Sequence, residues 1–221
     1  MATVTTTPDS IAERADQFSA FEWIQLHSRE LTFALIGLVA VGAGIAFYKR
    51  SGAIKEERAE RAYYTAMRSS QAGNKPLAIA DLDKVILRYN GTAAAALAAM
   101  SSAELQYDAG RPAEGVKSLQ KVSADGAAKP FAASIAALLA DGLVDQGKAS
   151  EAATKYREAA EKAVFPADRD IYLANAARAL QAAGKKDEAL KLWQQLASDA
   201  ESVQSAEAHV RIGELSAKPA K

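Results

Sequence analysis

A glycine recurs every 37 residues through most of the chain, at Gly73, Gly110, Gly147 and Gly184. The segments around these glycines resemble one another: QAGNKPLAIADLDKV, YDAGRPAEGVKSLQKV, VDQGKASEAATKYREA and QAAGKKDEALKLWQQL. A repeat of about 20 to 50 residues is the signature of a solenoid, in which each unit buries its apolar face only against its neighbours. The period therefore predicts a stacked array and not a globule built around one central core.

Each unit is predicted to be a helical hairpin. Glycine readily adopts the left-handed conformation that ends a helix, so the first helix should stop at the repeat glycine. Pro76 and Pro112 follow closely, which suits the first turn of a second helix, where a missing N–H is harmless. Lys185, Lys186 and Asp187 then become solvent-facing residues at a helix start, where the helix dipole favours the acid. Abundant alanine and scarce proline also favour an all-α fold.

Small and large side chains recur at the same positions in each unit, counted from the repeat glycine. An alanine precedes each glycine by seven residues, at Ala66, Ala103, Ala140 and Ala177. A small residue follows by five, at Ala78, Gly115, Ala152 and Ala189. A large residue follows by nine, at Leu82, Leu119, Tyr156 and Trp193. An apolar residue follows by twelve, at Val85, Val122, Ala159 and Leu196. Small residues let two helices approach closely, and the large residue fills the space beyond them.

The order of small, glycine, alanine and aromatic residues resembles the tetratricopeptide repeat, from Ile54 to about Ser198. The resemblance is strongest in GKASEAATKYREA and GKKDEALKLWQQL, whereas Leu82 and Leu119 replace the usual aromatic residue in the first two units. It implies antiparallel helix pairs in a superhelix with a concave groove. The period exceeds the usual length of about 34 residues, so the turns between repeats are expected to be longer. The proline that often closes a repeat is displaced to Pro166 and is missing after Gly184.

One segment is apolar enough to cross a membrane. Leu31 to Tyr48 is a run of 18 residues without a charge. At about 1.5 Å per residue it covers roughly 27 Å, close to the thickness of the hydrocarbon core. The alternatives are a buried core helix and a cleaved signal peptide, but polar residues precede the run and Lys49 and Arg50 follow it directly. A retained transmembrane helix is therefore favoured, with Trp23 and Tyr48 at its two interfaces.

The span and the repeats divide the chain into four predicted parts. Residues 1–30 form an N-terminal tail with an amphipathic pre-span helix or, alternatively, a frayed end. Residues 31–48 form the transmembrane helix, and residues 49–215 form about four hairpins and a capping helix. Residues 216–221 form a disordered tail. Within the span, Gly37, Ala40 and Gly44 share one face and could contact another membrane helix, although small residues are also simply common in spans.

A single anchor before an alanine-rich repeat domain resembles the ancillary subunit of the SecYEG translocon and its tetratricopeptide-like relatives. The resemblance rests on this architecture and on the anchor FEWIQLHSRELTFALIGLVAVGAG. It implies a single-pass protein of the bacterial inner membrane whose repeat domain lies in the periplasm. It also implies binding to the translocon and to folding factors, without catalytic residues. The positive-inside rule points the other way, because five basic residues follow the span and two precede it.

Composition argues against several kinds of chemistry. Lysine plus arginine equals aspartate plus glutamate at 27 each, so no net field attracts nucleic acid. The chain has no cysteine, and its two histidines, His27 and His209, stand far apart, so a metal site is not expected. No phosphate-binding loop, nucleophile elbow or calcium loop is present. We therefore expect no enzyme activity, no cofactor and no small-molecule substrate.

Protein binding is the remaining function. In tetratricopeptide arrays the first helices of successive hairpins line the groove, and the corresponding positions here are Tyr63, Met67, Met100, Glu104, Tyr107, Asp141 and Arg178. Alternatively, Met100 and Tyr107 pack between hairpins. The sequence thus predicts a membrane-anchored adaptor of the translocon or chaperone type. The alternative is a structural subunit of another membrane assembly, such as a respiratory or photosynthetic complex, held mainly by its transmembrane helix.

Overall fold

The computed structural model describes residues 23, 25 and 27–217, and every regular element among them is a helix. The predicted pre-span helix falls almost wholly on residues 1–22, 24 and 26, outside the described part. The chain divides into two compact units, Met1–Ile54 and Lys55–Lys221. The all-α prediction is confirmed.

The first unit contributes the start of one long helix, α2 (Ser28–Gln71). An 18-residue window of this helix has a mean hydropathy of 2.1, and none of the window is buried. By length and composition alone, α2 can cross a membrane. The helical stretch Gly126–Asp145 meets the same criterion, but 44% of its window is buried inside the repeat domain. The predicted limits of the span at residues 31 and 48 lie inside α2, where no break in the helix marks them.

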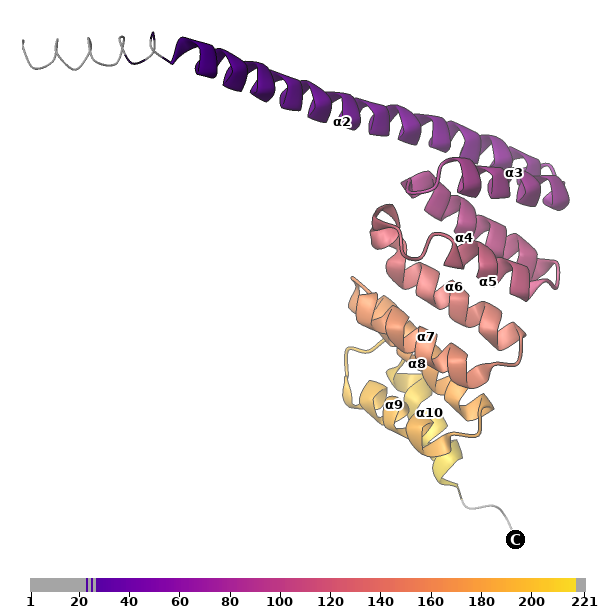
Figure 1. Cartoon of the computed structure of the whole chain (residues 1–221). Coiled ribbons are helices and arrows are strands. Elements are labelled where there is room, and N and C mark those ends of the chain that lie inside the picture. Colours follow the sequence, from indigo (N-terminus) through magenta and orange to yellow (C-terminus); the bar gives the residue numbers. More distant parts are fainter. Residues whose placement is uncertain (1–22, 24, 26, 218–221) are drawn as a thin grey trace, which may run out of the picture. The chain divides into compact units, whose positions relative to one another are not determined.

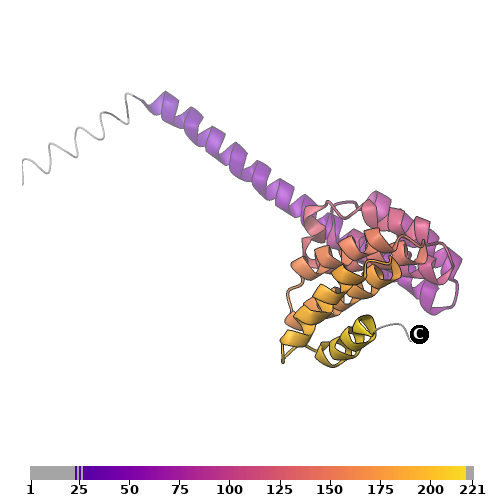
Figure 2. The same cartoon turned by 90° about the horizontal axis from the view of Figure 1, so that it is seen from below.

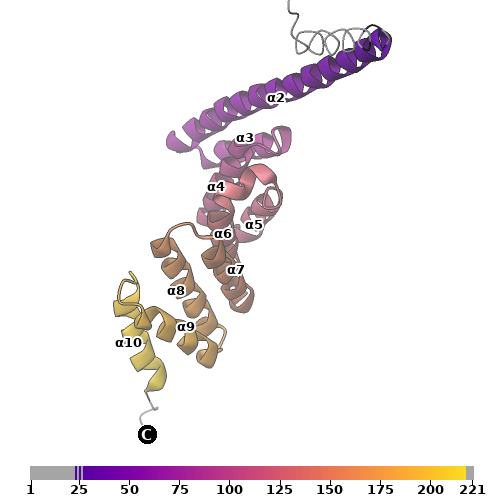
Figure 3. The same ribbon diagram turned by 90° about the vertical axis from the view of Figure 1, so that its left-hand side faces the viewer.

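The second unit is a stack of helical hairpins (Figures 1 and 3). The end of α2 pairs with α3 (Lys75–Arg88), and α4 (Ala93–Asp108) pairs with α5 (Pro112–Gln120). A short 3-10 helix, η1 (Gly126–Phe131), leads into α6 (Ala132–Asp145), which pairs with α7 (Ala149–Lys162). The last hairpin consists of α8 (Pro166–Ala182) and α9 (Lys186–Ser198). Helix α10 (Ser205–Ser216) packs on α9 at the C-terminal end of the stack (Figure 2).

The repeat glycines end the first helices, as predicted. Gly73, Gly110, Gly147 and Gly184 have φ of 80°, 69°, 74° and 76°, a region that side chains with a Cβ rarely adopt. Pro76 and Pro112 lie in the first turns of α3 and α5, also as predicted. Lys185, Lys186 and Asp187 are exposed.

The core includes the residues that the repeat pattern singles out. The four alanines that precede the glycines are no more than 1% exposed, and the four large residues are no more than 6% exposed. Trp193 is the largest fully buried side chain, and its indole Nε1 donates a 3.0 Å hydrogen bond to Gln181. Alternating small and large positions therefore hold the helices together across each hairpin.

The turns between repeats depart from the prediction. Only the connection between α5 and α6 is clearly extended, because α5 ends at Gln120 and η1 follows it. Val122 keeps its predicted burial, but in a turn and not in a helix. Only residues 163–165 separate α7 from α8. Elsewhere the extra residues of the long period lie in longer first helices, such as the 17 residues of α8.

Three hydrogen bonds fix the middle of α2, at Lys55 and Glu56, to the start of the second hairpin. Lys55 Nζ donates to the carbonyl of Asn90 at 2.6 Å. The carboxylate of Glu56 accepts from the backbone N–H groups of Ala93 at 3.3 Å and Ala94 at 3.1 Å. These N–H groups belong to the first turn of α4. The N–H groups of a first turn have no carbonyl partners within their own helix. The helix that carries the apolar run thus also caps the second hairpin.

Candidate protein-binding groove

The predicted groove residues all lie on the first helices of the hairpins. Tyr63 and Met67 are on α2, and Met100, Glu104 and Tyr107 are on α4. Asp141 is on α6 and Arg178 is on α8. No binding partner is present in the structure, so their role in binding stays a prediction.

Two of these side chains join neighbouring first helices, and a third joins the last first helix to α10. Tyr63 Oη lies 3.3 Å from Ser101 Oγ, which links α2 to α4. Tyr107 Oη donates to the carbonyl of Leu138 at 2.8 Å, which links α4 to α6. Arg178 Nε donates to Glu207 Oε1 at 3.0 Å, which links α8 to α10. These residues stabilise the stack whether or not they also contact a partner.

Tyr107 is a wedge between hairpins. A Cβ added at Gly115 would lie 2.4 Å from its ring, and one added at Gly142 would lie 2.4 Å from its hydroxyl. Glycine at both positions therefore makes room for the ring. Met67 and Met100 are half-buried against the same apolar cluster. This placement favours the packing role for Met100 and Tyr107 over direct contact with a partner.

Carboxylates give the middle of the groove a negative charge. Burial raises the pKa of Glu104, and the charges of Asp108 and Asp141 raise it further. Burial also raises the pKa of Asp141, and Asp145 adds to this, while the hydrogen bond that the Tyr156 hydroxyl donates to Asp141 opposes it. Lys75 pairs with Asp108 at 3.0 Å and offsets part of this charge. A cation from a partner would relieve the remaining repulsion.

A cavity of about 510 Å³ opens between α6, α7 and α8, close to these acids. Its wall is mainly apolar, and its polar groups come from Tyr156, Asn175 and Arg178. The other lining residues are Val144, Gly147, Ala149, Ala179 and Ala182. Val144 is 45% exposed although it is a large apolar side chain. Within the described part of the chain, no predicted groove residue bridges α6 to α8, and the cavity lies at this junction.

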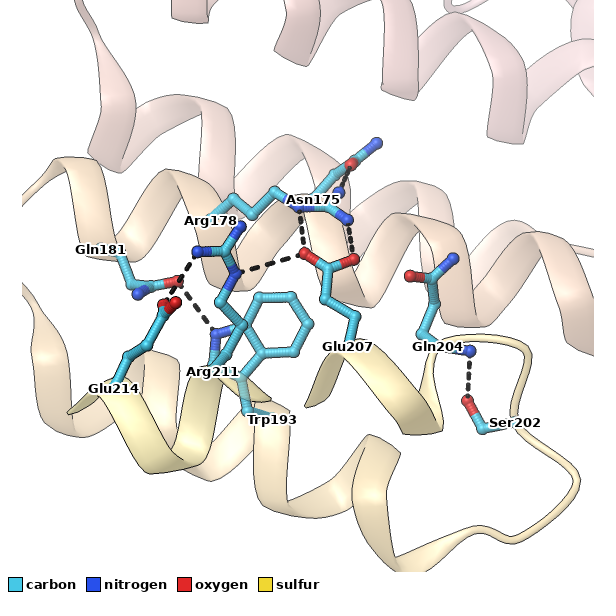
Figure 4. A network of polar contacts seen from close by, with 9 residues as sticks. All are labelled: Asn175, Arg178, Gln181, Trp193, Ser202, Gln204, Glu207, Arg211 and Glu214. Atoms are coloured by element: carbon cyan, nitrogen blue, oxygen red, sulfur yellow. Dashed lines mark hydrogen bonds and ion pairs between the residues drawn. The ribbon is translucent and has the colours of Figure 1, made fainter. Parts of the chain in front are cut away.

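A polar network around Arg178 joins α8 to α10 (Figure 4). The Arg178 guanidinium donates to Glu207 through two nitrogens and to Asn175 Oδ1 at 2.5 Å. It also lies over the Trp193 ring, 5.8 Å from the centroid. These hydrogen bonds from Arg178 lower the pKa of Glu207. Arg178 therefore anchors α10 while one side of it still lines the cavity.

Sequence reasoning missed Asp145, Tyr156 and Asn175. The groove was mapped from first helices only, and the repeat pattern assigned Tyr156, on a second helix, to packing alone. Its ring does pack, being 6% exposed, but its hydroxyl reaches Asp141 across the hairpin. The signal that could have found it is a tyrosine at a position where the other units have leucine or tryptophan, since only tyrosine brings a hydroxyl.

The predicted contact face on the apolar run is exposed. A Cβ added at Gly37 or Gly44 would meet no atom within 4 Å, and Ala40 is exposed as well. Nothing in the first unit covers this face, and its contact with another membrane helix stays a prediction. Among the described residues, no three metal-ligating side chains lie together.

Residues 22–152, more than half of the chain, match the family model of the tetratricopeptide repeat-like domain. The chain belongs to this family. Among solved structures it is similar to the nearly identical TPR-like repeats of a protein described as a kinesin light chain of Podosopora anserina, with 19% identity and a TM-score of 0.57. That match covers 72% of this chain and 86% of the other. The Q17M variant of the same protein matches equally well, over 85% of its length.

At such low identity, these structures establish the fold alone. No curated protein matches the sequence. Tetratricopeptide-like domains bind protein partners, and the fold is typically a non-enzymatic scaffold. The groove and its cavity are consistent with that role.

Proposed function

We propose that the chain is a non-enzymatic adaptor, anchored by the apolar part of α2 in the bacterial inner membrane, that holds a soluble protein partner next to an integral membrane complex. The observation that carries this proposal is a groove with acids and an apolar cavity, on a repeat domain whose first helix continues from an apolar run. The resemblance to the ancillary translocon subunit supports a translocon or chaperone adaptor in particular.

The chemistry of the groove specifies the segment that it binds. The carboxylates of Glu104, Asp141 and Asp145 favour a lysine or arginine, and the cavity beside Val144 is large enough for an apolar side chain. We therefore expect the partner to present an extended or helical segment that carries both kinds of side chain. Such a segment buries apolar area and pairs its charge in the same contact.

Site-specific photo-crosslinking in living cells tests this role. A photoreactive amino acid at Val144 faces the cavity, and the same group at Leu87, which is 69% exposed on α3, serves as the control on a second helix. We expect a defined crosslinked partner from position 144 and none of that mass from position 87. Asp141→Asn should reduce the crosslink. Identical products from both positions would contradict binding in the groove.

The side of the membrane is part of the proposal. The family resemblance supports a periplasmic repeat domain, whereas Lys49, Arg50, Lys55, Arg58 and Arg61 after the span favour the cytoplasm. We propose the periplasmic side. A reporter fused after Lys221 that is active only in the cytoplasm should give no signal, and a strong signal would reverse the assignment.

The exposed small-residue face of the anchor favours a second candidate function, that of a structural subunit of a respiratory, photosynthetic or other membrane complex. In that case the main contact is made through Gly37, Ala40 and Gly44, and the groove is empty. Gly37→Leu with Gly44→Leu should then release the complex in mild detergent. Gly42→Leu, on another face of the same helix, should not. Retention of the complex by the double variant would favour the groove.

A further inference from the structure

A second hollow, separate from the groove, lies in the first hairpin between α2 and α3. It has a volume of about 380 Å³ and is called here the α2–α3 hollow. Its lining residues are Arg61, Ala62, Thr65, Ala66, Asp81, Lys84, Val85, Arg88 and Tyr89. Three of these side chains are cationic and one is anionic, so its charge is opposite to that of the groove.

The cations of the α2–α3 hollow are available to a ligand. Arg61 pairs with Glu57 and Lys84 pairs with Asp81, and each partner is a neighbour on the same helix. The two cationic side chains are largely exposed, and exposed ion pairs contribute only about 0–1 kcal/mol, so Arg61 and Lys84 exchange readily to another anion. Among the described residues Arg88 has no ion pair, and its guanidinium lies 5.8 Å from the centroid of the Tyr89 ring.

The floor of the hollow indicates more than an inorganic anion. Ala62, Ala66, Val85 and Tyr89 present apolar surface below the charged rim. A phosphate ion would leave this surface unused. An acidic segment that also carries an apolar side chain would use both the floor and the rim.

The position along the chain favours a protein over lipid headgroups. Arg61 follows Tyr48, the last residue of the apolar run, by 13 residues in the sequence. The headgroup layer occupies only roughly 5–8 Å on each side of the hydrocarbon core. Lys55 binds the carbonyl of Asn90, just beyond α3, so the Arg88 end of α3 lies where α2 enters the repeat domain. The α2–α3 hollow therefore follows the apolar run more closely in the sequence than the groove cavity does, and we assign the membrane protein partner to it.

We propose that the α2–α3 hollow binds an acidic segment with an apolar anchor residue, exposed by the integral membrane partner. The assignment of this segment to a membrane partner rests on the proposed adaptor role, whereas the chemistry of the segment follows from the hollow itself. The adaptor then has two sites of opposite charge. The basic site next to the anchor takes the membrane complex, and the acidic groove takes the soluble partner, so neither partner competes for the other's site.

Fluorescence anisotropy with the full chain in phosphatidylcholine nanodiscs tests this proposal. The probe is a labelled peptide in which one leucine is flanked by glutamates, and a peptide with glutamines in place of the glutamates is its control. We expect saturable binding of the acidic peptide that weakens as salt rises, because exposed charge pairs are screened. The glutamine peptide should bind at least tenfold more weakly.

Two variants locate the site. Arg61→Gln with Arg88→Gln should weaken the acidic peptide at least tenfold. Lys186→Gln with Lys191→Gln, which removes the same charge from exposed positions on α9, should change binding less than twofold. Thr65→Trp fills the hollow from an exposed position and keeps its charges. With Thr65→Trp, the leucine peptide should bind no more tightly than an acidic peptide without leucine.

Equal binding by the Arg61/Arg88 variant and the wild type would overturn the proposal. So would an absence of peptide binding together with an enrichment of phosphatidylglycerol that depends on Arg61 and Arg88, which would assign the hollow to lipid. Competition by inorganic phosphate alone, without any effect of Thr65→Trp, would reduce it to a simple anion site. Asp141→Asn should leave the acidic peptide unaffected, so failure of the groove and failure of the hollow remain distinguishable.

Discussion

The glycines that hold Tyr107 show how single residues fix the spacing of this stack. Gly115 and Gly142 lie on two different hairpins and both face the same ring. Two glycines in helices cost backbone entropy, which here is offset by the close packing of a tyrosine that also hydrogen-bonds to Leu138. The ring is therefore a spacer between the second and third hairpins.

Gly115→Ala should destabilise the repeat domain, although alanine is the better helix former. The new methyl group would lie 2.4 Å from the Tyr107 ring, and overpacking of this kind costs about 1–3 kcal/mol. Gly213→Ala in α10 is the matched control, since its Cβ would meet no atom within 4 Å, and it should stabilise by about 0.5–1 kcal/mol. Urea unfolding followed by circular dichroism measures both. If Gly213→Ala were also destabilising, the free space around a glycine would not decide whether alanine raises or lowers the free energy of unfolding.

Glu104→Gln should raise stability and lower binding. The raised pKa of Glu104 means that its ionisation is less favourable in the folded than in the unfolded chain, so a cost to stability appears as the pH rises above the ordinary value of 4.5 and is complete above the raised pKa. The variant should therefore unfold at higher temperature at pH 7, and the difference should disappear as the pH falls below the ordinary value of 4.5. The crosslink from Val144 should weaken. A variant that loses stability at pH 7 would contradict this.

At the level of elements, most of the stack could be predicted from the sequence. The period located every hairpin, and the burial of Ala103, Leu119 or Trp193 followed from size alone. The early end of α5 could not be predicted, because Val122 is buried equally well from a turn. The cavity beside Val144 also escaped prediction, because it depends on how far apart α6 and α8 stand. The period fixes the order of these helices but not the gap between them.

Helix α10 depends on one carboxylate. The pKa of Glu207 is lowered mainly by the hydrogen bonds from Arg178, so it stabilises the fold above its ordinary pKa, and this contribution is lost as the pH falls through the lowered value. Glu207→Gln should speed amide hydrogen exchange in α10 at pH 7, with a loss of no more than about 1 kcal/mol. Glu214→Gln, in a more exposed pair with Arg211, should leave the exchange unchanged. Equal exchange in both variants would mean that packing alone holds α10.

Glu56 joins α2 to the second hairpin. Glu56→Gln keeps the shape of the side chain but removes the charge that favours the N-terminus of α4, so stability should fall by about 0.5–1 kcal/mol. Faster exchange should appear first at the amides of Ala93 and Ala94. Glu60→Gln, four residues further along α2 and exposed, is the matched control and should have no effect. Equal effects of the two variants would assign the change to the net charge of α2.

At the scale of the whole molecule, the division at Ile54 and Lys55 predicts that anchoring and folding are separable. The apolar clusters of the repeat domain all lie after Lys55, so the burial that holds the stack together does not involve the apolar run. A chain that starts at residue 55 should therefore keep its helical circular dichroism and its cooperative unfolding.

The full chain should remain in the membrane fraction after extraction at alkaline pH, because a run of about 18 apolar residues is long enough to cross the bilayer and a helix that crosses it is not held by charge. The chain from residue 55 should be fully released. A full-length variant with arginine in place of both Leu38 and Val41 provides the control, since two charges near the middle of the span disfavour insertion by about 5 kcal/mol or more. Release of the unaltered full chain would show that the apolar run does not span the membrane. The adaptor would then need another means of reaching its complex, whereas the groove would keep its proposed role.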